Sequence, residues 1–173
     1  MERLYRFPKE FLEDNCSPKM LLINDMDLDM AYDKKTPKEA RIAYFKEFAE
    51  RINADNRCFN RLKNRLEDSI KLAIKRVEWN YKTAIPMYNP RQKKGSLLLP
   101  LALLDESHVD LAMVVQRHAS GAYQEETILS LDYAYSNSRL ITRPDSDWLK
   151  VESIVKDSHE AVDDYEDDEE EDY

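Results

Sequence analysis

Residues 60–81, NRLKNRLEDSIKLAIKRVEWNY, decide the fold of this chain because they hold its most regular apolar pattern. Apolar side chains recur there at spacings of four and three residues, the period of one face of an α-helix. The members of this apolar stripe are Leu62, Leu66, Ile70, Ala73, Val77 and Tyr81. We therefore predict an amphipathic helix over residues 60–81.

The opposite side of the same predicted helix is basic and carries a tryptophan. At about 100° per residue, this side groups Arg61, Arg65, Leu72, Lys75, Arg76, Trp79 and Lys82. One interpretation is a solvated face that keeps the helix soluble, with Trp79 packed on a neighbouring element. The other is a phosphate-binding face whose aromatic side chain stacks on a base. Arg91, Lys93 and Lys94 follow soon after and favour this second interpretation.

The chain before this helix predicts irregular structure followed by a second helix. Thr36 as N-cap, Pro37 at the first helical position and Glu39 at the third form a capping box with proline, which predicts a helix to about Ile52. Upstream, aspartates alternate with apolar residues over residues 25–30. A calcium loop lacks support there, because Met30 and Thr36 stand where glycine and glutamate are needed. We expect a short extended segment with one polar face.

After Pro90 the apolar residues form short runs separated by polar turns. These runs, residues 96–104, 109–115 and 127–131, predict three antiparallel strands, with Pro100 at a sheet edge or a bulge. Residues 132–138 predict one or two helical turns with Asp132 as N-cap, and Leu140 and Ile141 a last short strand. The predicted class is α+β: two N-terminal helices packed on a small antiparallel sheet, forming a single domain over residues 1–149.

Charge is distributed unevenly along the 173 residues. The net charge is -9, yet residues 157–173 hold eleven acidic residues and no Lys or Arg, which leaves 26 basic against 24 acidic residues, or +2, in residues 1–156. Residues 57–94 hold eleven basic against three acidic residues, or +8. A run of like charges with little apolar content does not bury enough surface to fold. We expect residues 150–173 to form a disordered acidic tail.

Composition excludes several classes of function. Two glycines do not suffice for a Rossmann or P-loop phosphate motif, and the three histidines have no metal-binding spacing. Cys16 and Cys58 lack a CxxC spacing and are expected to be free thiols. No apolar run reaches membrane-spanning length, and the N-terminus has no signal-peptide pattern. We expect a cytoplasmic protein with no membrane association and no cofactor.

Several phrases resemble a bacterial family known as the domain of unknown function 3825. The resemblance covers about residues 56–149 and implies the C-terminal part of that family. It is carried by residues 74–77 (IKRV), 80–88 (NYKTAIPMY), 97–101 (LLLPL), 109–115 (VDLAMVV), Tyr123, residues 127–129 (TIL), 131–135 (LDYAY), Asn137, residues 139–140 (RL) and 143–149 (RPDSDWL). Some family members look fused to helix-turn-helix modules of a predicted RNA-binding type, and family members usually carry a further N-terminal portion. The resemblance therefore implies RNA as a partner, together with a separate N-terminal half or a neighbouring-gene protein.

The segment after residue 138 allows two interpretations. Arg139 and Arg143 offer a phosphate site, while Asp145 and Asp147, with Asp132 as a further ligand, offer a divalent-ion site. Alternatively the aspartates cap a turn, pair with the arginines, and Trp148 fills the core.

Three functions follow from these patterns. The first is an RNA-binding or regulatory module that uses the basic helix face and the Arg139/Arg143 end of the sheet. The second is a metal-assisted phosphodiesterase or related hydrolase. The third is a protein-interaction or immunity-type domain without chemistry.

Overall fold

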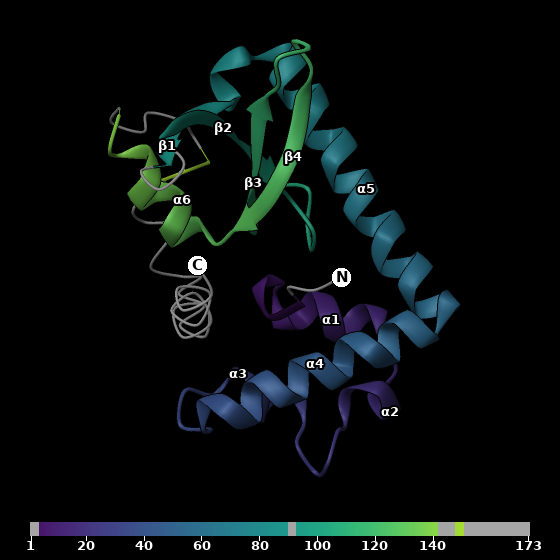
Figure 1. Ribbon diagram of the computed structural model, residues 1–173. Helices are drawn as coiled ribbons and strands as arrows, with labels where there is room; N and C mark the ends of the chain where they lie inside the picture. The colour runs from purple at the N-terminus through teal and green to yellow at the C-terminus, as the bar shows by residue number, and fades with distance from the viewer. Residues whose placement is uncertain (1–3, 90–92, 142–147, 151–173) are drawn as a thin grey trace. The chain divides into compact units, whose positions relative to one another are not determined.

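The computed structural model describes residues 4–89, 93–141 and 148–150 (Figure 1). These residues form two compact units, which divide between Arg65 and Leu66. Helix α5 (Asn56–Trp79) runs across the division. Residues 142–147 and the acidic segment from residue 151 lie outside the described residues, so the expected tail is not described.

The first unit is helical. Its elements before α5 are η1 (Leu4–Arg6), α1 (Lys9–Asn15), α2 (Pro18–Leu21), α3 (Leu28–Tyr32) and α4 (Lys38–Ala54). Aromatic side chains of α4 fill its core: Phe45 makes edge contacts with the rings of Tyr5, Tyr32 and Tyr44 at centroid distances of 6.2, 5.4 and 5.3 Å. The Tyr44 hydroxyl donates a hydrogen bond of 2.6 Å to the main-chain carbonyl of Leu21. Helix α4 therefore buries Tyr44, Phe45, Phe48 and Ile52.

Two local predictions in the first unit were wrong. Helix α4 begins at Lys38, and Pro37, not Thr36, occupies the cap position, without a side-chain cap. Residues 25–30 are not extended. Asn24 and Asp25 adopt positive φ angles of 49° and 62° in a tight turn, and the Asp27 carboxylate then accepts a 2.9 Å hydrogen bond from the Met30 amide to begin α3. Asp27 is therefore the N-cap of α3.

The predicted amphipathic helix is confirmed as α5, four residues earlier at its start and two residues shorter at its end. Asp55 caps it, since its carboxylate accepts hydrogen bonds from the amides of Arg57 and Cys58 at 2.9 and 3.1 Å. Leu62 and Ala73 of the apolar stripe are fully buried, and the rest of the stripe within α5 is half-buried. Tyr81 lies beyond the end of the helix and is 77% exposed, so its placement in the stripe was wrong.

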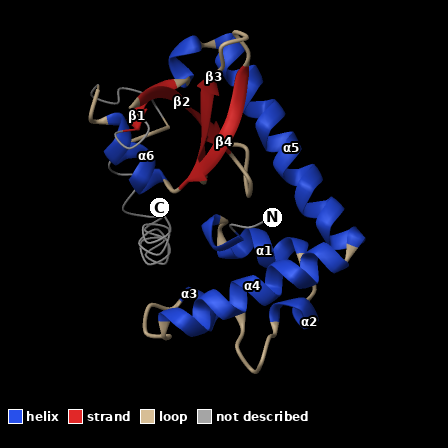
Figure 2. Ribbon diagram, in the orientation of Figure 1, coloured by secondary structure: helices blue, strands red, loops and turns tan. Residues whose placement is uncertain are grey.

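The second unit contains an antiparallel sheet with the strand order β1-β2-β3-β4 in its described residues (Figure 2). The strands are β1 (Ile85–Asn89), β2 (Lys94–Leu101), β3 (Leu111–Arg117) and β4 (Tyr123–Leu129). Pairing with β1 reaches only Leu98, so at Pro100 strand β2 pairs on its β3 side alone. The missing amide hydrogen of proline is tolerated at such a position. The register shifts between Val114 and Val115, where β3 faces β4.

Helix α6 (Leu131–Ser138) packs on this sheet beside β1 (Figure 1). Its cap residue is Ser130 rather than Asp132. Leu140 and Ile141 lie in a turn, so the last predicted strand is absent from the described residues; Ile141 donates its amide to the carbonyl of Ser138 at 3.1 Å. The α+β class is confirmed.

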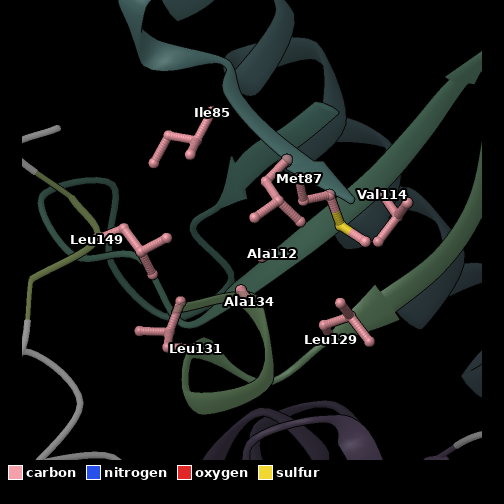
Figure 3. Close-up of a cluster of buried hydrophobic side chains, with 9 residues drawn as sticks. Ile85, Met87, Ala112, Val114, Leu129, Leu131, Ala134 and Leu149 are labelled. Atoms are coloured by element: carbon pink, nitrogen blue, oxygen red, sulfur yellow. The ribbon is translucent and has the colours of Figure 1, made fainter. Parts of the chain in front are cut away.

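The core of the second unit lies between the sheet and α6 (Figure 3). Its buried members are Ile85, Met87, Leu98, Ala112, Val114, Leu129, Leu131, Ala134 and Leu149. Leu149 is fully buried although it follows the undescribed residues 142–147. Leu149 therefore belongs to the core of the second unit.

Candidate nucleic-acid interface

Helix α5 ends in a turn that presents two aromatic side chains to solvent. Asn80 leaves the helical conformation, with φ -146° and ψ 101°, and its side chain accepts a hydrogen bond of 3.1 Å from the Lys82 amide. The Thr83 amide donates to the Asn80 carbonyl at 2.9 Å, which closes the short helix η2 (Tyr81–Thr83). An asparagine that bonds its own following backbone favours this kind of turn. This turn sets the backbone conformation between Trp79 and Tyr81.

Both aromatic residues are unusually open. Trp79 is 83% exposed and Tyr81 is 77% exposed, whereas large aromatic side chains normally bury most of their surface. Lys75, one helical turn before Trp79, is exposed, and so is Lys82. We call Lys75, Trp79, Tyr81 and Lys82 the aromatic–basic patch. Residues 71–82 hold four basic residues and one acidic residue, a net charge of +3 for this segment.

The backbone beneath this patch is tied to the core of the second unit. The indole of the half-buried Trp148 donates a 2.8 Å hydrogen bond from Nε1 to the Thr83 carbonyl, and the next residue, Leu149, is in the core. Trp148 thus packs against the core, as one interpretation of the sequence expected. The hydrogen bond from Trp148 therefore anchors the turn that contains Tyr81 and Lys82.

Arg76 is engaged within the protein. Its guanidinium donates a hydrogen bond to the main-chain carbonyl of Glu106 in the loop between β2 and β3. The same loop is ordered by Asp105, whose carboxylate accepts from the Ser107 amide at 2.6 Å; hydrogen bonds to Ser107 lower the pKa of that carboxyl group. Ser107 Oγ in turn lies 2.8 Å from His108 Nδ1. We assign Arg76 to positioning this loop.

The predicted basic face is divided between the two units. Arg61 and Arg65 belong to the first unit, and Arg61 donates a hydrogen bond of 3.3 Å to the Asn15 carbonyl there. Lys75, Arg76, Trp79 and Lys82 belong to the second. Within the second unit, Lys75, Trp79, Tyr81 and Lys82 are all exposed and lie close together in the sequence.

The proposed site after α6 is described only in part. Arg139 lies at the end of α6 with its guanidinium carbon 5.6 Å from the centroid of the Tyr135 ring, a cation–π contact. Asp132 is half-buried on α6. Arg143, Asp145 and Asp147 lie outside the described residues, as does Arg91. Among the described residues, no group of three or more His, Cys, Asp or Glu side chains is arranged to hold a metal ion.

Sequence reasoning missed two parts of the patch. Tyr81 continued the apolar spacing of α5 and was assigned to the buried stripe; Asn80, a cap-type residue at the end of a periodic segment, was the available signal. The hydrogen bond from Trp148 to Thr83, which supports the turn next to the patch, spans 65 residues, so no local sequence pattern predicts it.

Comparison with known proteins gives one family. A family model described as "Domain of unknown function (DUF3825)" matches residues 2–148. The match covers both units and extends the resemblance from residue 56 towards the N-terminus. No curated protein and no solved structure matches the chain. In the described part of the chain, every helix is too short or too polar to span a membrane.

Proposed function

The chain belongs to the DUF3825 family, whose description assigns no activity, and from the aromatic–basic patch we propose that it is an RNA-binding module that takes single-stranded RNA. The observation that carries the proposal is the exposure of Trp79 and Tyr81, 83% and 77%, between two exposed lysines. Exposed aromatic surface flanked by basic residues is typical of sites where bases stack and phosphates are neutralised.

The division of work within the patch follows from its chemistry. Stacking of one base on an aromatic ring contributes about 1–3 kcal/mol and needs an unpaired base, so Trp79 and Tyr81 favour single strands over duplexes. Lys75 and Lys82 contribute phosphate contacts, which are insensitive to sequence and weaken with salt. The resemblance to the family implies RNA as the partner, and single-stranded segments with splayed bases are the usual targets of sequence-specific RNA-binding proteins, so we propose RNA. A cytoplasmic location is part of this proposal.

The hydrolase alternative has less support than RNA binding. Its principal ligands, Asp145 and Asp147, lie outside the described residues, so it has no geometry to rest on. A protein partner for the same patch is the remaining alternative, and the experiment below separates it from RNA.

Fluorescence anisotropy with a labelled, unstructured RNA oligonucleotide and its duplex tests the proposal. We expect the Trp79→Ala variant to lose about tenfold or more in affinity for the single strand and little for the duplex. Tyr123→Ala is the matched control, because Tyr123 is also an exposed aromatic residue, 58% exposed, but lies on β4 and not in residues 75–82. The RNA hypothesis is contradicted if the wild-type protein does not bind the oligonucleotide, or if both variants lose the same affinity. A protein partner would then be the remaining hypothesis.

The basic half of the patch is tested by salt dependence. The Lys75→Glu/Lys82→Glu variant should bind more weakly and reduce the slope of log affinity against log salt by about 1.4, the value for two phosphate contacts on a single strand. Lys46→Glu, an exposed lysine of α4 in the first unit, makes the same type of charge change and should leave the slope within half a unit of the wild type.

A further inference from the structure

The first unit holds a pair of thiols in direct contact. The Sγ atoms of Cys16 and Cys58 lie 3.3 Å apart, although 42 residues separate them in sequence, and both side chains are 6% exposed. They are the two cysteines of the chain, and both are free. We propose that this pair is a redox-active dithiol that closes to an intramolecular disulfide and so locks the end of α1 to the start of α5. The proposal is independent of RNA binding.

Both cysteines stand at helix ends whose backbones are fixed. Cys16 is the C-cap of α1, and its amide donates to the Leu12 carbonyl at 2.9 Å. Cys58 lies in the first turn of α5, where its amide donates to the Asp55 carboxylate at 3.1 Å. A disulfide bond is about 2.05 Å long, so the sulfur atoms must approach by about 1.2 Å from their present separation. We expect rotation of the two side chains to supply this movement while the backbone hydrogen bonds at both helix ends are kept.

The surroundings of the pair favour a slow, thermodynamically driven reaction. Burial, together with the hydrogen bond to Cys58, raises the pKa of the Cys16 thiol. The Asn15 carbonyl lies beside the pair, 3.7 Å from Cys58 Sγ and 3.3 Å from Nη1 of Arg61. A buried thiol with a raised pKa exchanges slowly because the thiolate is the reactive species. The pair therefore suits a response to sustained oxidising conditions, and not rapid catalysis.

The reaction that we propose uses a low-molecular-weight disulfide, oxidised glutathione, as the oxidant. One protein thiol loses its proton and attacks a sulfur of oxidised glutathione, which forms a mixed disulfide and releases one glutathione thiolate. The second protein thiol loses its proton and attacks the protein sulfur of that mixed disulfide, which releases the second glutathione. One molecule of oxidised glutathione is thus reduced to two of glutathione, and the protein pair is oxidised by two electrons.

The experiment measures the equilibrium constant of this exchange in the full chain. Protein is equilibrated from both the reduced and the oxidised side in glutathione buffers, with and without denaturant, and the remaining thiols are counted by alkylation and intact mass. Because the fold holds the thiols together, the constant should be about 100-fold higher in the native chain than in the denatured chain. The oxidised product should be a monomer that has lost two hydrogen atoms.

Variants separate a specific pair from general oxidation. Cys16→Ala and Cys58→Ala should each retain one thiol that forms only a mixed disulfide with glutathione, in native and denatured protein alike. An equilibrium constant that is the same with and without denaturant would overturn the proposal. So would an oxidised native chain that consists of disulfide-linked dimers or of doubly glutathionylated monomers.

Discussion

Trp148 donates a hydrogen bond from its indole nitrogen to the main-chain carbonyl of Thr83, at 2.8 Å and across 65 residues of sequence. The bond joins the C-terminal end of the described chain to the turn that follows α5. Because Leu149, the next residue, is fully buried in the core of the second unit, the aromatic–basic patch is coupled to that core. The turn that follows α5 is therefore anchored to the core of the second unit.

The first prediction concerns this bond. Trp148→Phe keeps most of the apolar contact but removes the donor, so the half-buried Thr83 carbonyl loses its partner indole. We expect the free energy of unfolding to fall by about 1–2 kcal/mol. Trp79→Phe should change it by less than about 0.5 kcal/mol, because that side chain is exposed. Urea unfolding of both variants measures the difference, and equal stabilities would contradict the role given to Trp148.

The second prediction concerns Leu149. This side chain is fully buried in one cluster with Ile85, Leu131 and other core residues (Figure 3). The Leu149→Ala variant therefore leaves a cavity. We expect a loss of about 2–5 kcal/mol in the free energy of unfolding. Leu140→Ala is the control, since Leu140 is 59% exposed and should cost less than about 0.5 kcal/mol. Similar losses in the two variants would show that Leu149 does not pack as the structure describes.

Helix α5 was predictable from sequence and strand β1 was not, for physical reasons. In α5, an apolar side chain on every third or fourth residue over several turns leaves no competing periodicity. Strand β1 alternates buried and exposed residues, Ile85 and Met87 inward and Pro86 and Tyr88 outward, but it is short and contains a proline. At a sheet edge the missing proline amide costs little, and sequence alone does not reveal which strand lies at the edge.

The candidate site was predictable only where its residues act locally. Lys75 and Trp79 lie on α5 and follow from helical spacing, whereas Lys82, like Tyr81, lies beyond the end of that helix. Arg76 has the same spacing, but its guanidinium donates a hydrogen bond to a carbonyl 30 residues away. Helical spacing therefore did not predict that Arg76 is engaged within the protein. Such a bond depends on how the β2–β3 loop closes, which is a tertiary property of the fold.

The third prediction concerns alkaline pH. Burial raises the pKa of Tyr44, with a further contribution from Asp27, and burial also raises the pKa of Cys16. In the unfolded chain these groups ionise near their ordinary values of 10.0 and 9.0. Above about pH 9 the unfolded chain therefore releases protons that the folded chain keeps, and the free energy of unfolding falls as pH rises. Each group contributes up to about 1.4 kcal/mol per pH unit.

The Tyr44→Phe variant isolates one of these groups. It loses the hydrogen bond to Leu21 and should be about 1 kcal/mol less stable at neutral pH. It also lacks the phenol, so its stability should fall less steeply than that of the wild type above about pH 10. Denaturant unfolding at a series of pH values measures both slopes. Parallel curves would mean that the Tyr44 hydroxyl ionises as readily in the folded chain as in the unfolded chain.

The last prediction rests on the proposed RNA binding and on the distribution of charge. Residues 157–173 carry eleven acidic residues and no Lys or Arg, while residues 57–94 carry a charge of +8. An acidic segment in the same chain competes with a polyanion for basic residues. Each exposed charge pair contributes at most about 1 kcal/mol and is screened by salt, so the competition is confined to low ionic strength.

Deleting residues 157–173 changes the net charge from -9 to +2 and removes the competing anion. We expect the truncated chain to bind single-stranded RNA more tightly than the full chain at low salt, with the two affinities converging as salt approaches and exceeds physiological strength. A full-length chain in which the eleven acidic residues are replaced by Asn and Gln controls for length and should behave like the truncation. Anisotropy titrations across a salt series measure the difference. Equal affinities at low salt would restrict the acidic residues to a role in solubility.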